Sequence, residues 1–177
     1  MRILLIVVVC IISYFVITER EYNYDTSNIK VRYDDLLPAT KHQVDCLAEN
    51  IYFEAGHEPK DGKIAVGMVT LNRVNSHRWP RTICGVVKEK DSNVCQFSWW
   101  CEPKNKEKAI KAKYSRQERI IYNSAKEIAL YVYINYEDLK EDDLTNGAQF
   151  YHADYVNPGW KLKRTTKIGR HIFYKRT

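Results

Sequence analysis

An apolar stripe at helical spacing, ending directly before a glycine, is the feature that most constrains the fold of this chain. Leu47, Ile51 and Ala55 recur every four residues, and Gly56 follows at once. This spacing predicts a helix over residues 40–55, with Thr40 as its N-cap and Gly56 at its end. The stripe therefore predicts the first helix of a packed domain.

Glu54 stands beside this stripe, three residues after Ile51 and next to Tyr52 and Phe53. A carboxyl group held against aromatic surface is partly desolvated, which raises its pKa and keeps it protonated near neutral pH. A general acid needs this protonated state in order to protonate the leaving oxygen of a glycosidic bond. The alternative is a solvated glutamate, which is the commoner situation for a single Glu. We take Glu54 as the candidate catalytic residue.

The order of the remaining patterns predicts an α+β fold, with helices first and a small antiparallel sheet last. Pro59 suits the first turn of a helix that ends near Asn75 and carries Ile64, Met68 and Leu71 on one face. Thr82 is predicted to cap a turn of helix over 82–87. The capping box 115–118 is predicted to open a longer helix, whose buried face carries Ile121, Ala125, Ile128 and Val132. A loop and strand are predicted over 146–156, followed by a hairpin over 161–174 that turns near Gly169.

Residues 3–17 are apolar apart from Ser13 and follow Arg2. A helix of this length spans about 22 Å, short for a bilayer crossing but sufficient with flanking residues. No small-residue cleavage site precedes Thr18, which favours an uncleaved signal anchor over a cleaved signal peptide. We expect residues 1–18 to be the signal anchor or signal peptide, 19–39 a linker, and 40–177 a domain on the periplasmic or extracytoplasmic side of the membrane.

The cysteines are consistent with this topology. Cys10 lies in the apolar segment, which leaves Cys46, Cys84, Cys95 and Cys101 in the exported part. Four cysteines in an oxidising compartment permit three pairings, and the close spacing of Cys95 and Cys101 favours that pair together with Cys46–Cys84. Neither a Cys-x-x-Cys nor a His-Glu-x-x-His spacing is present in the sequence, so no metal and no cofactor is predicted.

The net charge of +6 is unevenly distributed, because residues 161–177 carry seven Lys or Arg and no acid. These cations alternate with Ile168, Ile172 and Tyr174, which fits strands with solvated basic outer faces better than a nucleic-acid-binding arm. No nucleic-acid partner is predicted, whereas attraction to an anionic polymer is compatible with the charge.

Two short segments carry side chains suited to binding a sugar, in which aromatic rings stack on C–H faces and polar groups meet hydroxyls. In the first, residues 96–100, polar and aromatic side chains alternate as on a strand with one face toward ligand. The alternative is a strand packed into the core. In the second, a Gly-Ala turn precedes a tyrosine and a histidine, and we assign the histidine only to substrate binding or to orienting another group. The predicted substrate-binding residues are Gln96, Phe97, Ser98, Trp99, Tyr151 and His152.

A larger set of motifs occurs in a fixed order between about residues 46 and 174. It comprises Leu47-Ala48, Ile51–Ala55, Glu58-Pro59, Gly62, Ala65-Val66, Val69–Val74, Trp79-Pro80, Thr82–Val87, Gln96–Trp99, Asn146–Ala148, Tyr151-His152, Pro158–Trp160 and Ile168–Tyr174. This ordered set resembles the SleB/CwlJ-type family of cell-wall hydrolases. One departure is that the family usually reads Glu-Ala-Arg-Gly-Glu, where this chain has Glu54-Ala55-Gly56-His57-Glu58.

The resemblance implies that residues 40–177 are a cell-wall hydrolase catalytic domain. It implies a helical, lysozyme- or lytic-transglycosylase-like core with a small antiparallel sheet, and peptidoglycan glycan strands as partner. A hydrolytic glycosidase generally needs two carboxylates, and a helix places Glu49 about 140° away from Glu54. A lytic transglycosylase needs one, because the C6 hydroxyl of muramic acid is its nucleophile. The resemblance implies this role for Glu54, with cleavage between N-acetylmuramic acid and N-acetylglucosamine.

Two other classes of protein remain as alternatives. One is an amidase or endopeptidase that acts on the stem peptide, with Cys46 as nucleophile and His152 as base. The other is a non-catalytic wall-binding module that uses residues 96–100. The sequence is compatible with a bacterial protein or with a protein of a phage that lyses bacteria.

Overall fold

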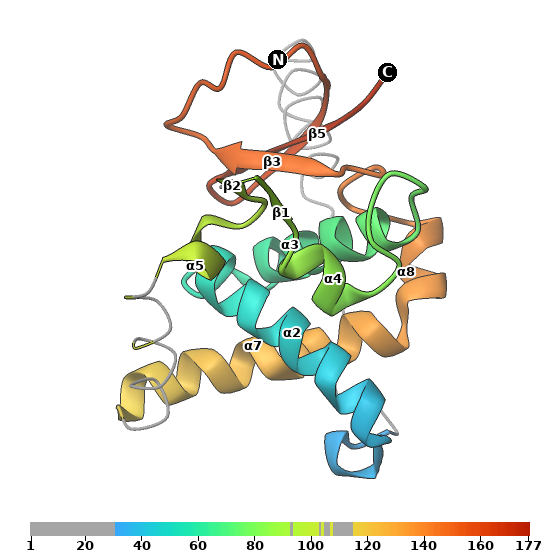
Figure 1. Ribbon diagram of the computed structural model, residues 1–177, viewed down its shortest axis with the longest axis vertical. Helices are drawn as coiled ribbons and strands as arrows, with labels where there is room; N and C mark the ends of the chain where they lie inside the picture. Colours follow the sequence, from blue (N-terminus) through green and yellow to red (C-terminus); the bar gives the residue numbers. More distant parts are fainter. Residues whose placement is uncertain (1–30, 93, 103, 105–106, 108–114) are drawn as a thin grey trace, which may run out of the picture.

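The computed structural model describes residues 31–92, 94–102, 104, 107 and 115–177, which form a group of packed helices beneath a small sheet (Figure 1). The predicted membrane segment 3–17, Cys10 and most of the predicted linker lie outside these residues. The described helices include none that is both long and apolar enough to cross a bilayer. The elements are η2 (Tyr33–Asp35), α2 (Pro38–Ala55), α3 (Lys60–Val74), α4 (Ile83–Val87), β1 (Lys90–Asp91), β2 (Val94–Cys95), α5 (Ser98–Cys101), α7 (Arg116–Ile134), α8 (Tyr136–Glu141), β3 (Phe150–Ala153), β4 (Lys163–Ile168) and β5 (His171–Lys175).

Helix α2 carries the predicted apolar stripe, and Leu47, Ile51 and Ala55 are all buried. The prediction that Thr40 caps this helix is wrong, because α2 already begins at Pro38 and no side chain caps it. Proline suits the first helical turn, since its fixed φ matches the helix and its missing N–H would have no partner there. Gly56 is the C-cap, as predicted, and its φ of −55° is right-handed.

Helices α2, α3 and α7 pack closely on one another. The predicted apolar face of α3 is confirmed, since Ile64, Met68 and Leu71 are buried. A Cβ at Gly67 would lie 3.3 Å from Ile51 Cδ1 and 3.3 Å from Val132 Cγ1. The glycine therefore permits the close approach of the three helices.

A buried polar group joins three of the helices. Asn50 is fully buried in α2, and its amide donates to Thr70 Oγ1 of α3 at 3.1 Å. Its carbonyl accepts from Trp99 Nε1 of α5 at 3.0 Å. Because each buried amide atom has a partner, the network stabilises one arrangement of these helices.

Two predicted helix caps are confirmed. Thr82 Oγ1 accepts from the Gly85 amide at 3.0 Å at the start of α4. Ser115 Oγ accepts from the Glu118 amide at 3.5 Å at the start of α7. The carboxylate of Glu118 accepts a hydrogen bond from the Tyr52 hydroxyl and so links α7 to α2.

The C-terminal sheet is antiparallel with strand order β3-β5-β4, which confirms the predicted hairpin and the α+β class. Gly169, at the turn between β4 and β5, has a φ of +54°. Tyr151 of β3 pairs with Phe173 of β5, and both pack against the helical core. Their neighbours Phe150 and Tyr174 therefore lie on the outer face of the sheet.

Candidate active site

Glu54 lies in the last turn of α2, half-buried beneath the sheet. Its Oε2 accepts a hydrogen bond from the Tyr151 hydroxyl at 3.2 Å. Desolvation by burial raises the pKa of Glu54, while the Tyr151 hydrogen bond and the positive charge of Arg73 act in the opposite direction. The predicted effect of burial on this carboxyl is thus present in the structure.

Tyr151 supplies the hydroxyl from the middle of β3. Its ring packs edge-on against His171, with centroids 5.2 Å apart, and against Phe173 at 5.7 Å. Burial, followed by the negative charge of Glu54, raises the pKa of Tyr151 well above its usual value. The phenol therefore stays protonated and acts as a fixed donor toward Glu54.

Arg73 of α3 brings a buried positive charge to the site. Its Nε donates to the Gln149 carbonyl at 2.7 Å, and its guanidinium lies 4.4 Å from the Trp79 ring centroid and 5.0 Å from that of Phe97. Arg73 Nη1 is buried without a hydrogen-bond partner among the described residues. A guanidinium stays charged even when buried, so Arg73 fixes a cation near Glu54.

Glu89, between α4 and β1, is a second carboxyl group within the electrostatic reach of Arg73. Its Oε2 is buried and has no hydrogen-bond partner in the described part of the chain. Burial raises the pKa of Glu89, and Arg73 opposes that effect. Sequence reasoning missed both Arg73 and Glu89 as site residues. For Arg73, the available signal was a cation in the last turn of α3, two residues after Leu71 of the apolar face.

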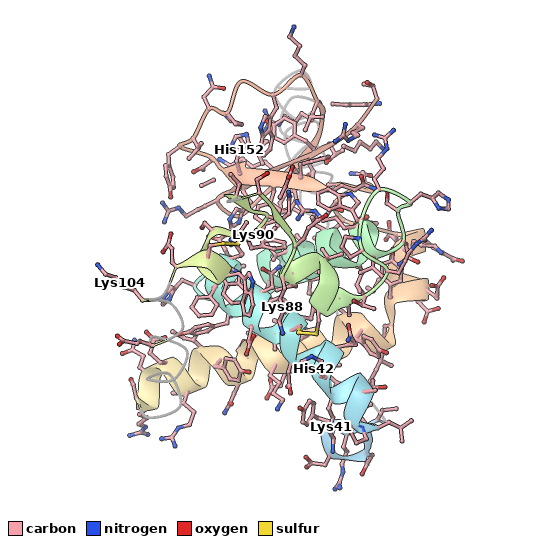
Figure 2. The ribbon with its side chains drawn as sticks, viewed as in Figure 1. Lys41, His42, Lys88, Lys90, Lys104 and His152 are labelled. Carbon is pink, nitrogen blue, oxygen red and sulfur yellow. A yellow bond between two sulfur atoms is a disulfide. The ribbon has the colours of Figure 1, made fainter. Side chains whose placement is uncertain are left out.

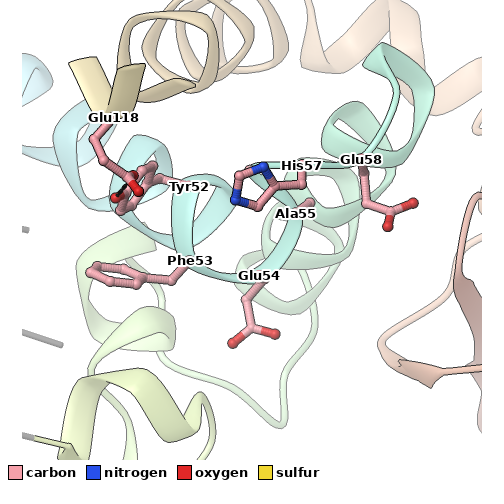
Figure 3. A pocket seen from close by; sticks show the side chains of 8 residues that line it. Tyr52, Phe53, Glu54, Ala55, His57, Glu58 and Glu118 are labelled. Carbon is pink, nitrogen blue, oxygen red and sulfur yellow. Dashed lines mark hydrogen bonds between the residues drawn. The ribbon is translucent and has the colours of Figure 1, made fainter. Parts of the chain in front are cut away.

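A cavity of about 120 Å³ opens beside Glu54 at the α2–α3 junction (Figure 3). Its lining comprises residues 52–58 together with Glu118. Figure 3 shows Glu54 on one side of this hollow and the Tyr52–Glu118 pair on another. The acid is thus reachable from solvent, although burial affects its ionisation.

Glu58 connects this junction to the sheet. Its Oε2 accepts from the Arg170 amide at 3.0 Å, directly after the hairpin turn at Gly169. A Cβ at Gly169 would lie 2.0 Å from this oxygen, and the φ of +54° also favours glycine at this position. Glu58 therefore fixes the hairpin that carries His171 and Phe173.

The segment 96–100 does not form the predicted strand, because β2 ends at Cys95 and α5 begins at Ser98. The alternation of burial is nevertheless present: Phe97 and Trp99 are buried, while Gln96 and Ser98 are exposed. Trp99 stacks on Phe53, with centroids 4.4 Å apart. The two buried rings support the α2 end that carries Glu54, and of the four residues only Gln96 and Ser98 are open to ligand.

His152 lies on the other face of β3 from Tyr151, as strand geometry requires. Its Nδ1 donates to the Ala153 carbonyl at 2.9 Å, and its Nε2 lies 3.0 Å from the Tyr174 hydroxyl. Trp160 packs edge-on against this ring at 5.5 Å. The structure therefore places Tyr151 at Glu54 and His152 in an outer aromatic cluster.

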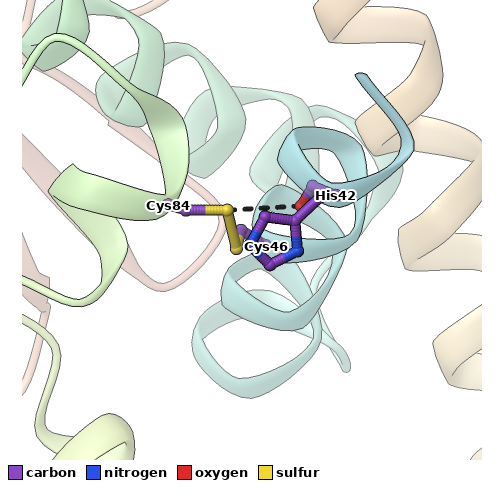
Figure 4. A group of neighbouring side chains, drawn as sticks. All are labelled: His42, Cys46 and Cys84. Carbon is purple, nitrogen blue, oxygen red and sulfur yellow. Dashed lines mark hydrogen bonds between the residues drawn. A yellow bond between two sulfur atoms is a disulfide. The ribbon is translucent and has the colours of Figure 1, made fainter. Parts of the chain in front are cut away.

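The four described cysteines form the two favoured disulfides, Cys46–Cys84 and Cys95–Cys101. Figure 4 shows His42 beside the first pair, and Cys84 Sγ lies 3.3 Å from the His42 carbonyl oxygen. Among the described residues, this is the one cluster of three side chains with metal-ligand atoms close together. Its sulfurs are consumed by the disulfide, so it offers no thiolate.

These positions do not fit a cysteine nucleophile. Cys46 is bonded to Cys84 and buried. Figure 2 shows His152 at the sheet and His42, next to that disulfide, on α2 well away from the sheet. Cys46 and His152 therefore cannot act as a nucleophile–base pair in this structure.

The fold is a helical domain with a small antiparallel sheet over a half-buried carboxyl group, and comparison with known proteins gives the family. The chain belongs to the Cell Wall Hydrolase family, whose model matches residues 57–174. This match begins three residues after Glu54, at His57, which is the second of the two positions where the chain departs from the usual family motif.

Several curated relatives are spore cortex-lytic enzymes. The chain is 29% identical over 140 residues to that of Oceanobacillus iheyensis, covering 77% of this chain and 42% of the relative. It is 29% identical over 150 residues to that of Halalkalibacterium halodurans, covering 83% and 37%. The chain thus spans about two fifths of the length of these relatives.

Two solved structures share the fold. One is the catalytic domain of the Bacillus cereus SleB protein, with a TM-score of 0.52, 26% identity, and coverage of 76% of this chain and 91% of that one. The other is the catalytic domain of the germination-specific lytic transglycosylase SleB from Bacillus anthracis, with a TM-score of 0.53, 26% identity, and coverage of 76% and 95%.

Proposed function

We propose that this protein is a lytic transglycosylase that cleaves peptidoglycan glycan strands between N-acetylmuramic acid and N-acetylglucosamine, with Glu54 as its acid and base. Membership of the Cell Wall Hydrolase family supports the substrate class. The similarity to a domain described as a lytic transglycosylase supports the type of reaction. The observation that carries the proposal is the half-buried carboxyl of Glu54, with its raised pKa and its fixed Tyr151 donor.

The proposed reaction has two steps at one carboxyl group. Protonated Glu54 first donates its proton to the glycosidic oxygen, so that the bond to the muramic acid C1 breaks and positive charge develops at that carbon. The resulting carboxylate then removes the proton from the C6 hydroxyl, whose oxygen forms the new bond to C1. Tyr151 and Arg73 stabilise the carboxylate formed between the steps, because each favours the ionised state of Glu54.

A second candidate function is a hydrolytic glycosidase that uses Glu89 as its other carboxylate. The observation that favours it is the buried Oε2 of Glu89, which has no hydrogen-bond partner among the described residues, and the charge of Glu89 acts on Arg73 as that of Glu54 does. Such an enzyme activates water and leaves a reducing end instead of a 1,6-anhydro ring.

Mass spectrometry of the products from purified peptidoglycan tests both functions. We expect 1,6-anhydromuramic ends from the wild type, and a loss of about 10²–10⁴-fold in rate for Glu54→Gln. Glu89→Gln should retain anhydro products and most of the rate. Reducing ends, together with inactivation by Glu89→Gln, would establish the hydrolytic route instead. Full activity of Glu54→Gln would refute both.

We also propose that residues 3–17 anchor the protein in the membrane, with the domain on the periplasmic or extracytoplasmic side. The apolar character of the segment and the two disulfides support this location. Cell fractionation with external protease tests the proposal. Recovery of a soluble protein whose chain begins after Thr18 would show a cleaved signal peptide.

A further inference from the structure

A basic hollow lies at the C-terminal end of α3, beside the edge of the sheet. It has a volume of about 260 Å³ and is open to solvent. Its lining residues are Ser76, Arg78, Gly147, Gln149, Lys175 and Arg176, so three cations and no acid face the space. We propose that this hollow binds a carboxylate of the peptide stem that muramic acid carries, an inference that rests on the proposed function.

The three cations keep donors available for such a ligand. Lys175 Nζ donates to the Asn146 carbonyl at 2.9 Å, which leaves two of its three hydrogens. Arg176 stacks over the Phe150 ring, 5.4 Å from its centroid, and stacking leaves the edge of a guanidinium open. Arg78 makes neither a hydrogen bond nor a salt bridge with any residue that the structure describes. None of the three pairs with an acid within that part of the chain.

The carboxylate of Asp143, which contacts the lining residue Gly147, already accepts several hydrogen bonds. Asp143 accepts from the Thr145 amide at 2.8 Å, from the Gly147 amide at 2.8 Å and from Asn72 Nδ2 at 2.8 Å. These donors hold the Asp143 carboxylate in the turn that leads to Gly147. These oxygens are therefore occupied by neutral donors, and Asp143 forms no salt bridge with the three cations of the hollow.

The hollow is connected to the candidate active site through Gln149. Gln149, in its wall, precedes Tyr151 by two residues, which is about 7 Å along a strand. The Gln149 carbonyl also accepts from Arg73, whose charge acts on Glu54. The proposal requires that a glycan strand with its scissile bond at Glu54 direct the stem of the same muramic acid toward this wall.

The chemistry of the hollow suits a carboxylate. The forked donors of Arg78 and Arg176 match the two oxygens of a carboxylate group. Each stem carries free carboxylates and is attached to the muramic acid whose bond is cleaved. A teichoic-acid phosphodiester satisfies the same donors, but it belongs to a separate polymer. The shared attachment favours the stem.

Binding of defined glycan strands to a Glu54→Gln chain tests this proposal without turnover. The probes are peptide-bearing strands and strands stripped of their stems by an amidase, both free of teichoic acid. An exposed charge pair contributes a factor of up to about five, so we expect about 5- to 20-fold tighter binding of peptide-bearing strands at low salt. Adding Arg78→Gln and Arg176→Gln should remove this preference.

The matched control adds Arg116→Gln and Arg119→Gln instead, which changes the charge equally at two exposed positions of α7. Helix α7 lies on the far side of the helices from the sheet (Figure 1), so this control should keep the preference. A third probe, stripped strands that still carry teichoic acid, separates the two sources of anion. Equal affinity of the Glu54→Gln chain for the first two probes would overturn the proposal, as would tighter binding of the third probe alone. Stem preference in a protein whose wild type cleaves no glycan would refute the proposed function alone.

Discussion

Replacing Tyr151 by phenylalanine should shift the pH dependence of activity. The Tyr151 hydroxyl donates to Glu54 Oε2 at 3.2 Å and so favours the carboxylate over the protonated acid. A hydrogen bond to a charged group contributes about 1.5 kcal/mol at the lower end of the usual range, and this long bond belongs there. Since 1.36 kcal/mol corresponds to about one pKa unit, Tyr151→Phe should raise the pKa of Glu54 by about one unit.

The direction of the effect on activity follows from the role of the protonated acid. Activity falls on the alkaline side as Glu54 loses its proton, so a higher pKa moves this limb of the pH–rate profile upward by about one pH unit. Turbidity loss of purified peptidoglycan between pH 4 and 9 measures the limb.

A matched control is Tyr174→Phe, which removes a hydroxyl that contacts His152 on the outer face of the same sheet. The control should leave the limb in place. An unmoved or lowered alkaline limb in Tyr151→Phe would refute the assigned hydrogen bond as an influence on Glu54.

Three further predictions concern stability. Burial raises the folded-state pKa of Glu54, so its contribution to stability is present at low pH and lost as pH rises through that pKa. The melting temperature of Glu54→Gln relative to wild type should therefore increase with pH, as calorimetry at pH 4 and pH 8 can measure. Asn50→Ala should cost about 2–4 kcal/mol in urea unfolding, because two buried hydrogen bonds are lost. The double substitution of Cys46 and Cys84 by serine should cost about 4 kcal/mol, since that disulfide joins residues 38 positions apart.

Each of these three predictions can be contradicted by one result. A relative melting temperature that is constant with pH would mean that Glu54 ionises as easily in the folded as in the unfolded chain. Unfolding of Asn50→Ala at the wild-type urea midpoint would show that its hydrogen bonds do not stabilise the helices. Equal stability of the double serine variant and the oxidised wild type would show that the cross-link leaves the unfolded ensemble unconstrained.

The main helices and the final hairpin were predictable, because their signals are local. Ile64, Met68 and Leu71 follow the helical period, and Thr82 caps a helix through an amide three residues away. The start of α2 was misplaced because Pro38, which opens the helix, lies two residues before the polar Thr40. Proline is over-represented at the first helical position, so Pro38 was a start signal in its own right.

Only those parts of the site that depend on local sequence could be predicted. The position of Glu54 beside the apolar stripe of α2 was enough to single it out, whereas its Tyr151 partner comes from a strand 97 residues later. The roles of Arg73 and Glu89 depend on the packing of α3 against the sheet and of the α4–β1 turn against α3, and sequence spacing does not encode these contacts. The strand expected over residues 96–100 failed for a related reason: α5 begins at Ser98, and Trp99 of that helix stacks on Phe53 of α2, a contact that sequence spacing does not encode.

The covalent ring closed by Cys46 and Cys84 contains Glu54 and Arg73, together with all of α3. A protease that cuts the exposed turn after α3, around Asn75 or His77, would break the backbone inside this ring and release neither piece. The two fragments would remain one molecule until a reductant opens the disulfide. The turn is therefore a natural place to split the chain, and an engineer could make new termini there while the disulfide keeps the acid and its cation on the same covalent unit.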